Sequence, residues 1–208
     1  MRAVIAALLL AAASATAQAQ DGKGYVGFGA GIGNYPDLCS QVPAGLSCDD
    51  SPFAWKFFAG YMILPYIGIE GGFNDFGAAK TQGLLLNPPA GTVPLPSNAD
   101  VYTQIWSLSL VGRVPLGPAA IMGRVGYGAT MSKISGMAQV QDTTTGAITT
   151  YDASTRGTSG QMIYGAGFSW DFLGSWTARV DWDHSKGDDG TNPKYNVDMY
   201  TLGIAYRF

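Results

Sequence analysis

The sequence has little charge, one histidine, two cysteines and a single glutamate. Only 13% of its residues are charged, whereas about a quarter are charged in an ordinary soluble domain. One histidine and two cysteines offer too few ligands for the usual metal centres, so we expect no metal and no other cofactor. The net charge is −3 and no basic stripe occurs, which argues against nucleic acid as a partner.

Long apolar runs are also missing after the amino-terminal segment. That segment has a positively charged start, an apolar stretch that ends at Ala13, and small residues up to Ala19. The pattern predicts a secretory signal peptide over residues 1–19, because the stretch is shorter than the roughly 20 residues of a membrane anchor. We expect residues 20–208 to form one domain, and the lack of a later run of about 18 apolar residues argues against a transmembrane helix.

Glycine and aromatic residues are abundant instead, and they alternate with apolar residues. The chain has 29 Gly, 11 Tyr, 9 Phe and 5 Trp. In residues 24–33, apolar side chains occupy every second position and glycines fill most of the others. Period two is typical of a strand with one apolar face, and it recurs seven more times. The predicted strands are 24–33, 53–63, 67–74, 106–110, 121–129, 168–172, 176–183 and 200–208.

The polarity of the second face decides between two all-β folds. In a soluble periplasmic or secreted β-sandwich, that face meets water and would carry many Lys and Glu residues. Here it consists of Gly, Ser, Thr and Asn with a few isolated charges, as the crowded interior of a small barrel requires. The sequence therefore predicts an eight-stranded antiparallel up-and-down transmembrane β-barrel.

The predicted connections alternate between short and long. Tight turns are expected at 64–65, 115–118 and 173–175, where Pro and Gly are frequent. Long loops are expected at 34–52, 77–100, 132–160 and 184–196. This asymmetry is typical of outer-membrane barrels, with short turns and both termini periplasmic and the loops outside.

Two further features fit an exported barrel. Cys39 and Cys48 have eight residues between them in a segment that resembles a loop, and in an oxidising compartment they predict a disulfide rather than a metal site. Aromatic residues near strand ends fit girdles at the two membrane interfaces. These are Tyr25, Trp55, Trp106, Trp176, Trp182 and Phe208.

With the strands placed, the sequence resembles the OmpA/OmpX-like family of small outer-membrane barrels, without the peptidoglycan-binding domain of OmpA. The most specific stretch is residues 58–73, with a Gly-Tyr strand, a Pro turn and a Gly-x-Glu-x-Gly-aromatic strand. Shorter matches lie at 25–27, 123–126, 178–181 and 205–208. The resemblance implies that Tyr206 and Phe208 belong to the carboxy-terminal signal read by the outer-membrane assembly machinery.

Glu70 is the only glutamate in the chain, and by alternation it points into the barrel. A buried carboxylate costs several kcal/mol unless it is paired. Arg124 and Arg179 are the inward-facing cations on other strands, and the resemblance places a Glu/Arg cluster at these three positions.

The second interior glutamate of OmpA corresponds here to Ser169, so Asp181 or Asp171 is expected as the second acid. One interpretation of this polar cluster is a plug, because an eight-stranded barrel is too narrow for an open channel. The alternative is a small gated ion pore.

An enzyme is a further alternative, because some eight-stranded barrels modify lipid A. A Ser hydrolase needs Ser and His on one face, but His184 and Ser185 are neighbours and would point to opposite faces of a strand. Asp188 and Asp189 resemble acids of outer-membrane proteases, which are larger barrels, and solvated loop acids are the simpler interpretation.

The sequence as a whole predicts a non-enzymatic, monomeric outer-membrane protein whose long loops serve envelope integrity, adhesion or host interaction. The expected partners are outer-membrane lipid and lipopolysaccharide, the assembly machinery, and a host or surface ligand bound through the loops. A small gated pore is the alternative, and a lipid A-modifying enzyme a weaker one.

Overall fold

The computed structural model describes residues 23–36, 38–39, 47–82, 92–95, 98–152, 154–188 and 194–208. The predicted signal peptide, residues 1–19, lies outside these ranges. Within them, no helix is long and apolar enough to cross a membrane. The strands are β1 Gly24–Asn34, β2 Cys48–Asp49, β3 Phe53–Leu64, β4 Ile67–Gln82, β5 Thr92–Leu95, β6 Asn98–Leu116, β7 Ala119–Asp142, β8 Ile148–Asp152, β9 Thr155–Phe172, β10 Trp176–Gly187 and β11 Tyr195–Arg207.

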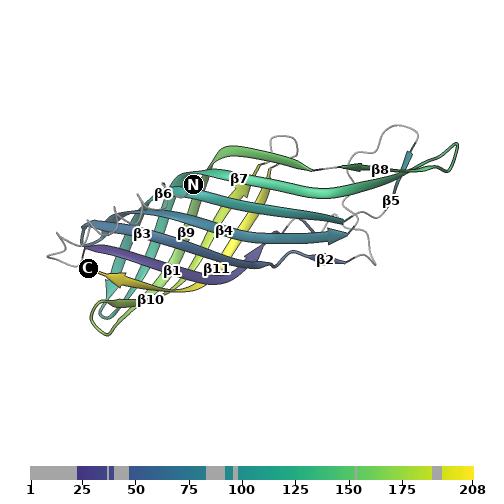
Figure 1. Cartoon of the computed structure of the whole chain (residues 1–208). Coiled ribbons are helices and arrows are strands. Elements are labelled where there is room, and N and C mark those ends of the chain that lie inside the picture. The colour runs from purple at the N-terminus through teal and green to yellow at the C-terminus, as the bar shows by residue number, and fades with distance from the viewer. Residues whose placement is uncertain are drawn as a thin grey trace, which may run out of the picture.

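Eight of these strands close into a ring of antiparallel pairs (Figure 1). The order around the ring is β1-β3-β4-β6-β7-β9-β10-β11. The last strand pairs with the first over ten residues, from Tyr25 opposite Arg207 to Asn34 opposite Asp198. This ring confirms the predicted eight-stranded up-and-down barrel, and its closure removes the exposed sheet edges that favour aggregation.

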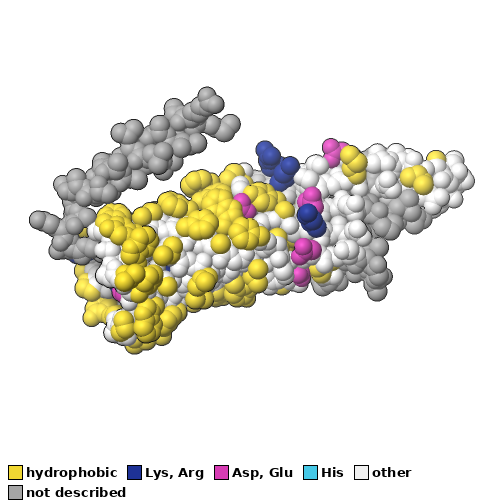
Figure 2. Space-filling view, turned by 60° about the horizontal axis from the view of Figure 1, so that its bottom comes forward, with side chains coloured by type: hydrophobic (Ala, Val, Ile, Leu, Met, Phe, Trp, Pro, Cys, Tyr) yellow, Lys and Arg dark blue, Asp and Glu magenta, His cyan; other side chains and the backbone are white. Residues whose placement is uncertain are grey.

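The alternation in the sequence corresponds to the two faces of the barrel wall. On β3, Phe53, Phe57 and Tyr61 point outward and are 67%, 47% and 51% exposed, whereas Lys56 and Phe58 are 1% and 2% exposed. Hydrophobic side chains cover much of the face of the barrel seen in Figure 2, and most of the charged side chains visible in this view lie where the hydrophobic cover ends. Soluble proteins rarely expose apolar patches of this size, so the outer face fits lipid, not water, and the β-sandwich is ruled out.

The two ends of the barrel differ. At one, the turn end, three tight turns connect the strands at 65–66, 117–118 and 173–175, as predicted. Gly117 and Gly174 adopt positive φ angles of 69° and 68° there, a conformation that costs glycine little. Gly24 and Phe208 exchange backbone hydrogen bonds at the same end, so both described chain ends lie there. The opposite end is the loop end.

Several strands continue further toward the loop end than predicted. β4 runs to Gln82, β7 runs to Asp142 and β9 begins at Thr155, so the predicted loops 77–100 and 132–160 were too long. Backbone pairing persists there although the apolar alternation has ended, because strand pairing outside lipid does not require an apolar face. β8 and β5 pair with the end of β7 and extend this projection (Figure 1).

The aromatic girdle is largely as predicted, with one error. Trp106 and Trp176 are 54% and 40% exposed on the outer face. Trp55 packs against Phe73 with ring centroids 5.2 Å apart, which begins an aromatic row near the loop end. Tyr25, however, points into the barrel and is 9% exposed, because it has the same parity as the inward-facing glycines of β1.

Candidate functional site

A layer of six charged side chains crosses the barrel interior between the turn end and the loop end. They come from β3, β4, β7 and β10, and all six are at inward-facing positions. Their side chains are at most 8% exposed. Three are cations and three are acids, so their formal charges cancel. We call this set the charged layer: Lys56, Glu70, Arg124, Arg179, Asp181 and Asp183.

Glu70 connects one half of the charged layer. Arg124 Nη1 donates to its Oε1 and Arg179 Nη1 to its Oε2, each at 2.8 Å. The Tyr25 hydroxyl also donates to Oε2, at 2.9 Å. Three donors therefore satisfy a carboxylate that would be costly to bury alone.

Lys56 connects the other half. Its Nζ lies 2.9 Å from Oδ2 of both Asp181 and Asp183. Arg179 Nη2 lies 3.2 Å from Asp181 Oδ1, and Arg124 Nη2 contacts Asp183. Each cation thus contacts at least two acids, so the six groups form one network in which no charge is left uncompensated.

Apolar layers lie on both sides of the charged layer. β3 contributes one inward-facing residue to each layer: Ala54 to the apolar layer toward the loop end, Lys56 to the charged layer and Phe58 to the apolar layer toward the turn end. Toward the turn end the apolar layer contains Tyr25, Phe58 and Ala205, with Met62 packed against them. Toward the loop end it contains Tyr35, Ala54, Phe76, Ala79, Val101, Ile105, Ile134, Val197 and Met199.

Little free volume remains within the charged layer. A cavity beside Lys56, Glu70 and Arg124 has a volume of about 10 Å³, enough for about one water molecule. The guanidinium of Arg179 lies 4.1 Å from the ring centre of Phe58. This cation–π contact joins the charged layer to the apolar layer on its turn-end side. An ion could cross only if several of these side chains moved.

The comparisons with known proteins agree with this architecture. The profile of the outer membrane protein beta-barrel domain matches residues 3–208. The chain belongs to this family. It is 25% identical over 224 residues to outer membrane protein A of Shigella flexneri, covering 99% of this chain and 55% of that protein. Identity to outer membrane protein A of Salmonella typhi is also 25%, over 229 residues and with the same coverage.

The chain thus spans about half the length of these relatives. Among solved structures, the crystal structure of Ail from Yersinia pestis aligns with a TM-score of 0.49 at 19% identity, over 89% of this chain and 97% of that one. A major outer membrane protein from Thermus thermophilus aligns with a TM-score of 0.49 at 15% identity, over 89% and 98%. The predicted OmpA/OmpX-like resemblance is confirmed by the family match.

In this family member, the structure brings Glu70, Arg124, Arg179 and Asp181 together in the charged layer. Asp171 lies elsewhere, at the turn end, where it pairs with Arg113 at 2.9 Å and Arg207 at 3.0 Å. Ser169 is 1% exposed, and its hydroxyl has no hydrogen-bond partner among the described residues.

Lys56 and Asp183 are not among the predicted site residues. Both lie at positions that the alternation predicts to face inward, which is the signal that could have found them. The sequence alone does not show the register of the strand pairs around the ring. That register brings Lys56 of β3 and Asp183 of β10 to the same height, although β3 and β10 do not pair with each other.

His184 and Ser185 point to opposite faces of β10, as their adjacency predicted. The Ser185 hydroxyl donates to the Met162 carbonyl at 2.8 Å. His184 faces outward, and its Nδ1 lies 2.8 Å from Asp198 Oδ1. The outward neighbours of His184 on its own strand are Trp182 and Lys186, so this His–carboxylate pair has no Ser, Thr or Cys beside it on β10.

The other predicted ligand groups are dispersed. Asp188 lies 3.4 Å from Lys194 near the loop end, while Asp189 is outside the described ranges. Among the residues that the structure describes, no three His, Cys, Asp or Glu side chains converge as a metal site.

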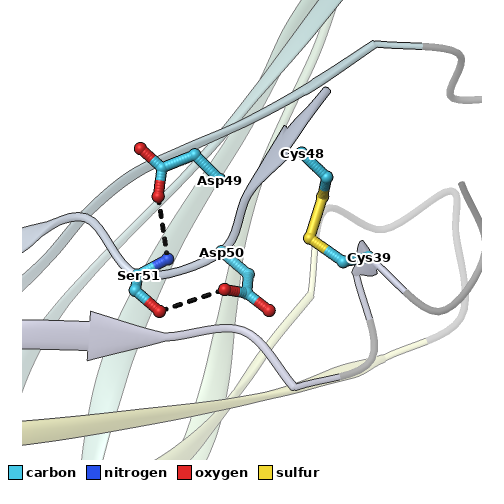
Figure 3. The surroundings of a disulfide bond; sticks show 5 residues. All are labelled: Cys39, Cys48, Asp49, Asp50 and Ser51. Carbon is cyan, nitrogen blue, oxygen red and sulfur yellow. Dashed lines mark hydrogen bonds between the residues drawn. A yellow bond between two sulfur atoms is a disulfide. The ribbon is translucent and has the colours of Figure 1, made fainter. Parts of the chain in front are cut away.

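The predicted disulfide between Cys39 and Cys48 is confirmed, with Cα atoms 5.8 Å apart (Figure 3). Cys48 begins β2, whose two residues pair with Thr81 and Lys80 on the extension of β4. Next to it, Asp49 accepts a hydrogen bond from the Ser51 amide at 3.2 Å (Figure 3). The bridge thus ties the segment after β1 to the loop end of the barrel wall.

Proposed function

We propose that this protein is a non-conducting scaffold of the bacterial outer membrane. The loops at the loop end face the outside and serve envelope integrity or adhesion to host or other surfaces, and the turn end faces the periplasm. Family membership and the apolar outer face support the membrane location. The two described chain ends at the turn end fit the arrangement common to such barrels, in which the termini are periplasmic.

The closely packed interior is the observation that carries this proposal. A neutral network of six buried charges lies between two apolar layers, and a conducting path would have to disrupt all three. Breaking a buried ion pair costs about 3–5 kcal/mol, and burying an ion among apolar side chains costs more. Such an interior supports a plug that stabilises the wall.

A small gated pore is the second candidate, and one observation favours it. Arg124 contacts Glu70 at 2.8 Å, and its Nη2 lies 3.8 Å from Asp181 and in contact with Asp183. It therefore has alternative acidic partners, and an exchange between them could open a narrow path without leaving a charge unpaired.

Recordings from purified protein in planar bilayers separate the two candidates. We expect no steady conductance from the unmutated protein and no large conductance from Glu70→Ala, because the apolar layers remain. Ser169→Ala is the matched control, since it alters a buried inward-facing residue outside the charged layer. Steady, large currents in the unmutated protein would refute the scaffold and establish the pore.

Export and assembly belong to the same proposal. Residues 1–19 act as the signal peptide, so sequencing of the mature protein should begin at Gln20. Tyr206 and Phe208 form the terminal signal for the assembly machinery. A Phe208→Ala variant should therefore accumulate less in the outer membrane than Tyr200→Ala, which changes an exposed aromatic residue of β11 nearer the loop end.

We further propose that the protein is not an enzyme. A hydrolase needs a nucleophile beside the general base, and the His184–Asp198 pair has none on its own strand. Mass spectra of lipid A from cells that express the protein should be the same for the unmutated chain and for His184→Ala. A lipid A change that depends on His184 would restore the enzyme.

A further inference from the structure

Two basic side chains face each other on the outer surface of the barrel. Lys133 on β7 lies directly opposite Arg156 on β9 in the strand register, and both are exposed. The residues on either side of Lys133, Ser132 and Ile134, are buried inside, so Lys133 points outward. Like charges directly opposite each other on neighbouring strands are destabilising.

Neither side chain has an acidic partner among the described residues. Asp100, the acid nearest to Lys133 along β6, lies opposite Lys80 on β4. Asp75 accepts hydrogen bonds from the hydroxyl of Tyr102 at 2.5 Å and the amide of Gln104 at 3.1 Å, so its carboxylate is already engaged. No described carboxylate therefore forms an ion pair with either cation.

The height of Lys133 and Arg156 on the barrel wall indicates which anion could offset the repulsion between them. Lys133 lies four residues beyond Ala129, which pairs with Trp106 of the aromatic row near the loop end. With a rise of about 3.3 Å per residue and a tilt of about 40°, four residues place the pair roughly 10 Å beyond this row, toward the loop end. Aromatic girdles mark the membrane interfaces of such barrels, so the pair lies beyond the acyl chains, at the level of the sugars of a leaflet made of lipopolysaccharide.

We propose that Lys133 and Arg156 together bind one phosphate group on the saccharide part of lipopolysaccharide. Arg offers a planar fork that matches phosphate oxygens, and Lys adds a compact charge from the opposite strand. The bound phosphate would remove the repulsion between the two cations. The inference rests on the proposed function only for the orientation, with the loop end outside.

Binding of lipopolysaccharide to purified, folded barrels tests this site. The probe is a short lipopolysaccharide, lipid A with its phosphorylated inner core, titrated onto unmutated protein and Lys133→Ser/Arg156→Ser. The matched control is Lys186→Ser/Lys194→Ser, which removes two other exposed cations near the loop end. Heat-modifiable gel migration verifies that each variant is folded.

We expect the Lys133/Arg156 variant to bind at least about tenfold more weakly, since both charged hydrogen-bond donors to the phosphate are removed. The control variant should differ by less than about twofold. Dephosphorylating the inner core should remove the difference between unmutated protein and the Lys133/Arg156 variant.

Equal binding by the unmutated protein and the Lys133/Arg156 variant would overturn the site. A difference that persists with the dephosphorylated sugar, or equal competition by phosphatidylglycerol bilayers, would also overturn it, because the anion would then not be a saccharide phosphate. These in vitro results do not depend on conductance. Failure of the proposed orientation would appear separately, as protection of the loop end from protease added to intact cells.

Discussion

At the scale of single residues, Glu70 is a buried carboxylate that three donors hold in place. It is 4% exposed and accepts hydrogen bonds from two arginines and a tyrosine. Replacing it leaves three buried cations with two acids. The consequence is a net charge in a site where every group is removed from water.

Glu70→Ala should therefore lower the free energy of unfolding by about 3 kcal/mol or more, because it leaves buried charge uncompensated. Ser169→Ala should change it by less than about 1 kcal/mol, since the serine hydroxyl has no partner to lose. Urea titrations that follow the folded gel band measure both. If Glu70→Ala were as stable as the control, the charged layer would not stabilise the barrel.

Asp171 offers a contrasting prediction at the turn end. Its carboxylate pairs with Arg113 and Arg207, but these side chains are 21–27% exposed, so solvent screens the pairs. Asp171→Asn should cost only about 1 kcal/mol. The loss should shrink in 1 M salt, where the Debye length is about 3 Å, whereas the Glu70→Ala effect should persist. A salt-independent loss of more than about 3 kcal/mol would contradict this assignment.

At the scale of elements, the hairpin formed by β7 and β8 depends on its turn. Asp142 Oδ1 accepts the backbone amides of Thr145 at 2.7 Å and Thr144 at 2.8 Å. These two hydrogen bonds lower the pKa of the Asp142 carboxyl, with that from Thr145 the larger cause. The charged form is thus the one that holds the turn.

Because the folded pKa of Asp142 is lowered, its stabilisation is fully present above the ordinary aspartate value of about 4. It is lost as the pH falls below that value and through the folded pKa. Amide exchange of Thr144 and Thr145 should accelerate over this acidic range, and Asp142→Ala should show fast exchange at every pH. Exchange that is independent of pH after correction for intrinsic rates would refute the role of Asp142.

The disulfide gives a second prediction for an element. Cys39→Ser/Cys48→Ser should leave the barrel folded, because the bridge lies outside the ring of eight strands. Protease should cleave the segment between β1 and β3 faster than in the unmutated protein, since the bridge no longer ties it to β2. Cleavage between β9 and β10, at the turn end, is the internal control and should not change.

The sequence was a good guide to elements that meet lipid and a poorer guide elsewhere. The period-two alternation identified all eight strands, because lipid outside and a crowded interior impose different side chains on the two faces. Pro and Gly between the strands identified the three tight turns. The extensions of β4 and β7 toward the loop end lack this alternation, because water borders them. The register that aligns Lys56 with Asp183 is a property of the closed ring, which no single segment encodes.

At the scale of the whole molecule, the outer face, the interior and the loop end of the barrel have different side chains and different roles. The outer face is apolar, the interior is filled by the charged layer and the apolar layers, and the loop end carries the disulfide, the projecting β7–β8 hairpin and the Lys133–Arg156 pair. An interaction with other surfaces can vary at the loop end without altering the charged layer, because the two are built from different parts of the strands.

Whether this chain folds as a closed barrel in the outer membrane is decided by cell fractionation combined with heat-modifiable gel migration. We expect the protein in the outer-membrane fraction, with an unboiled band that shifts on boiling, because the closed ring resists detergent at room temperature. A protein that stays soluble in the periplasm, with a single band before and after boiling, would contradict the barrel.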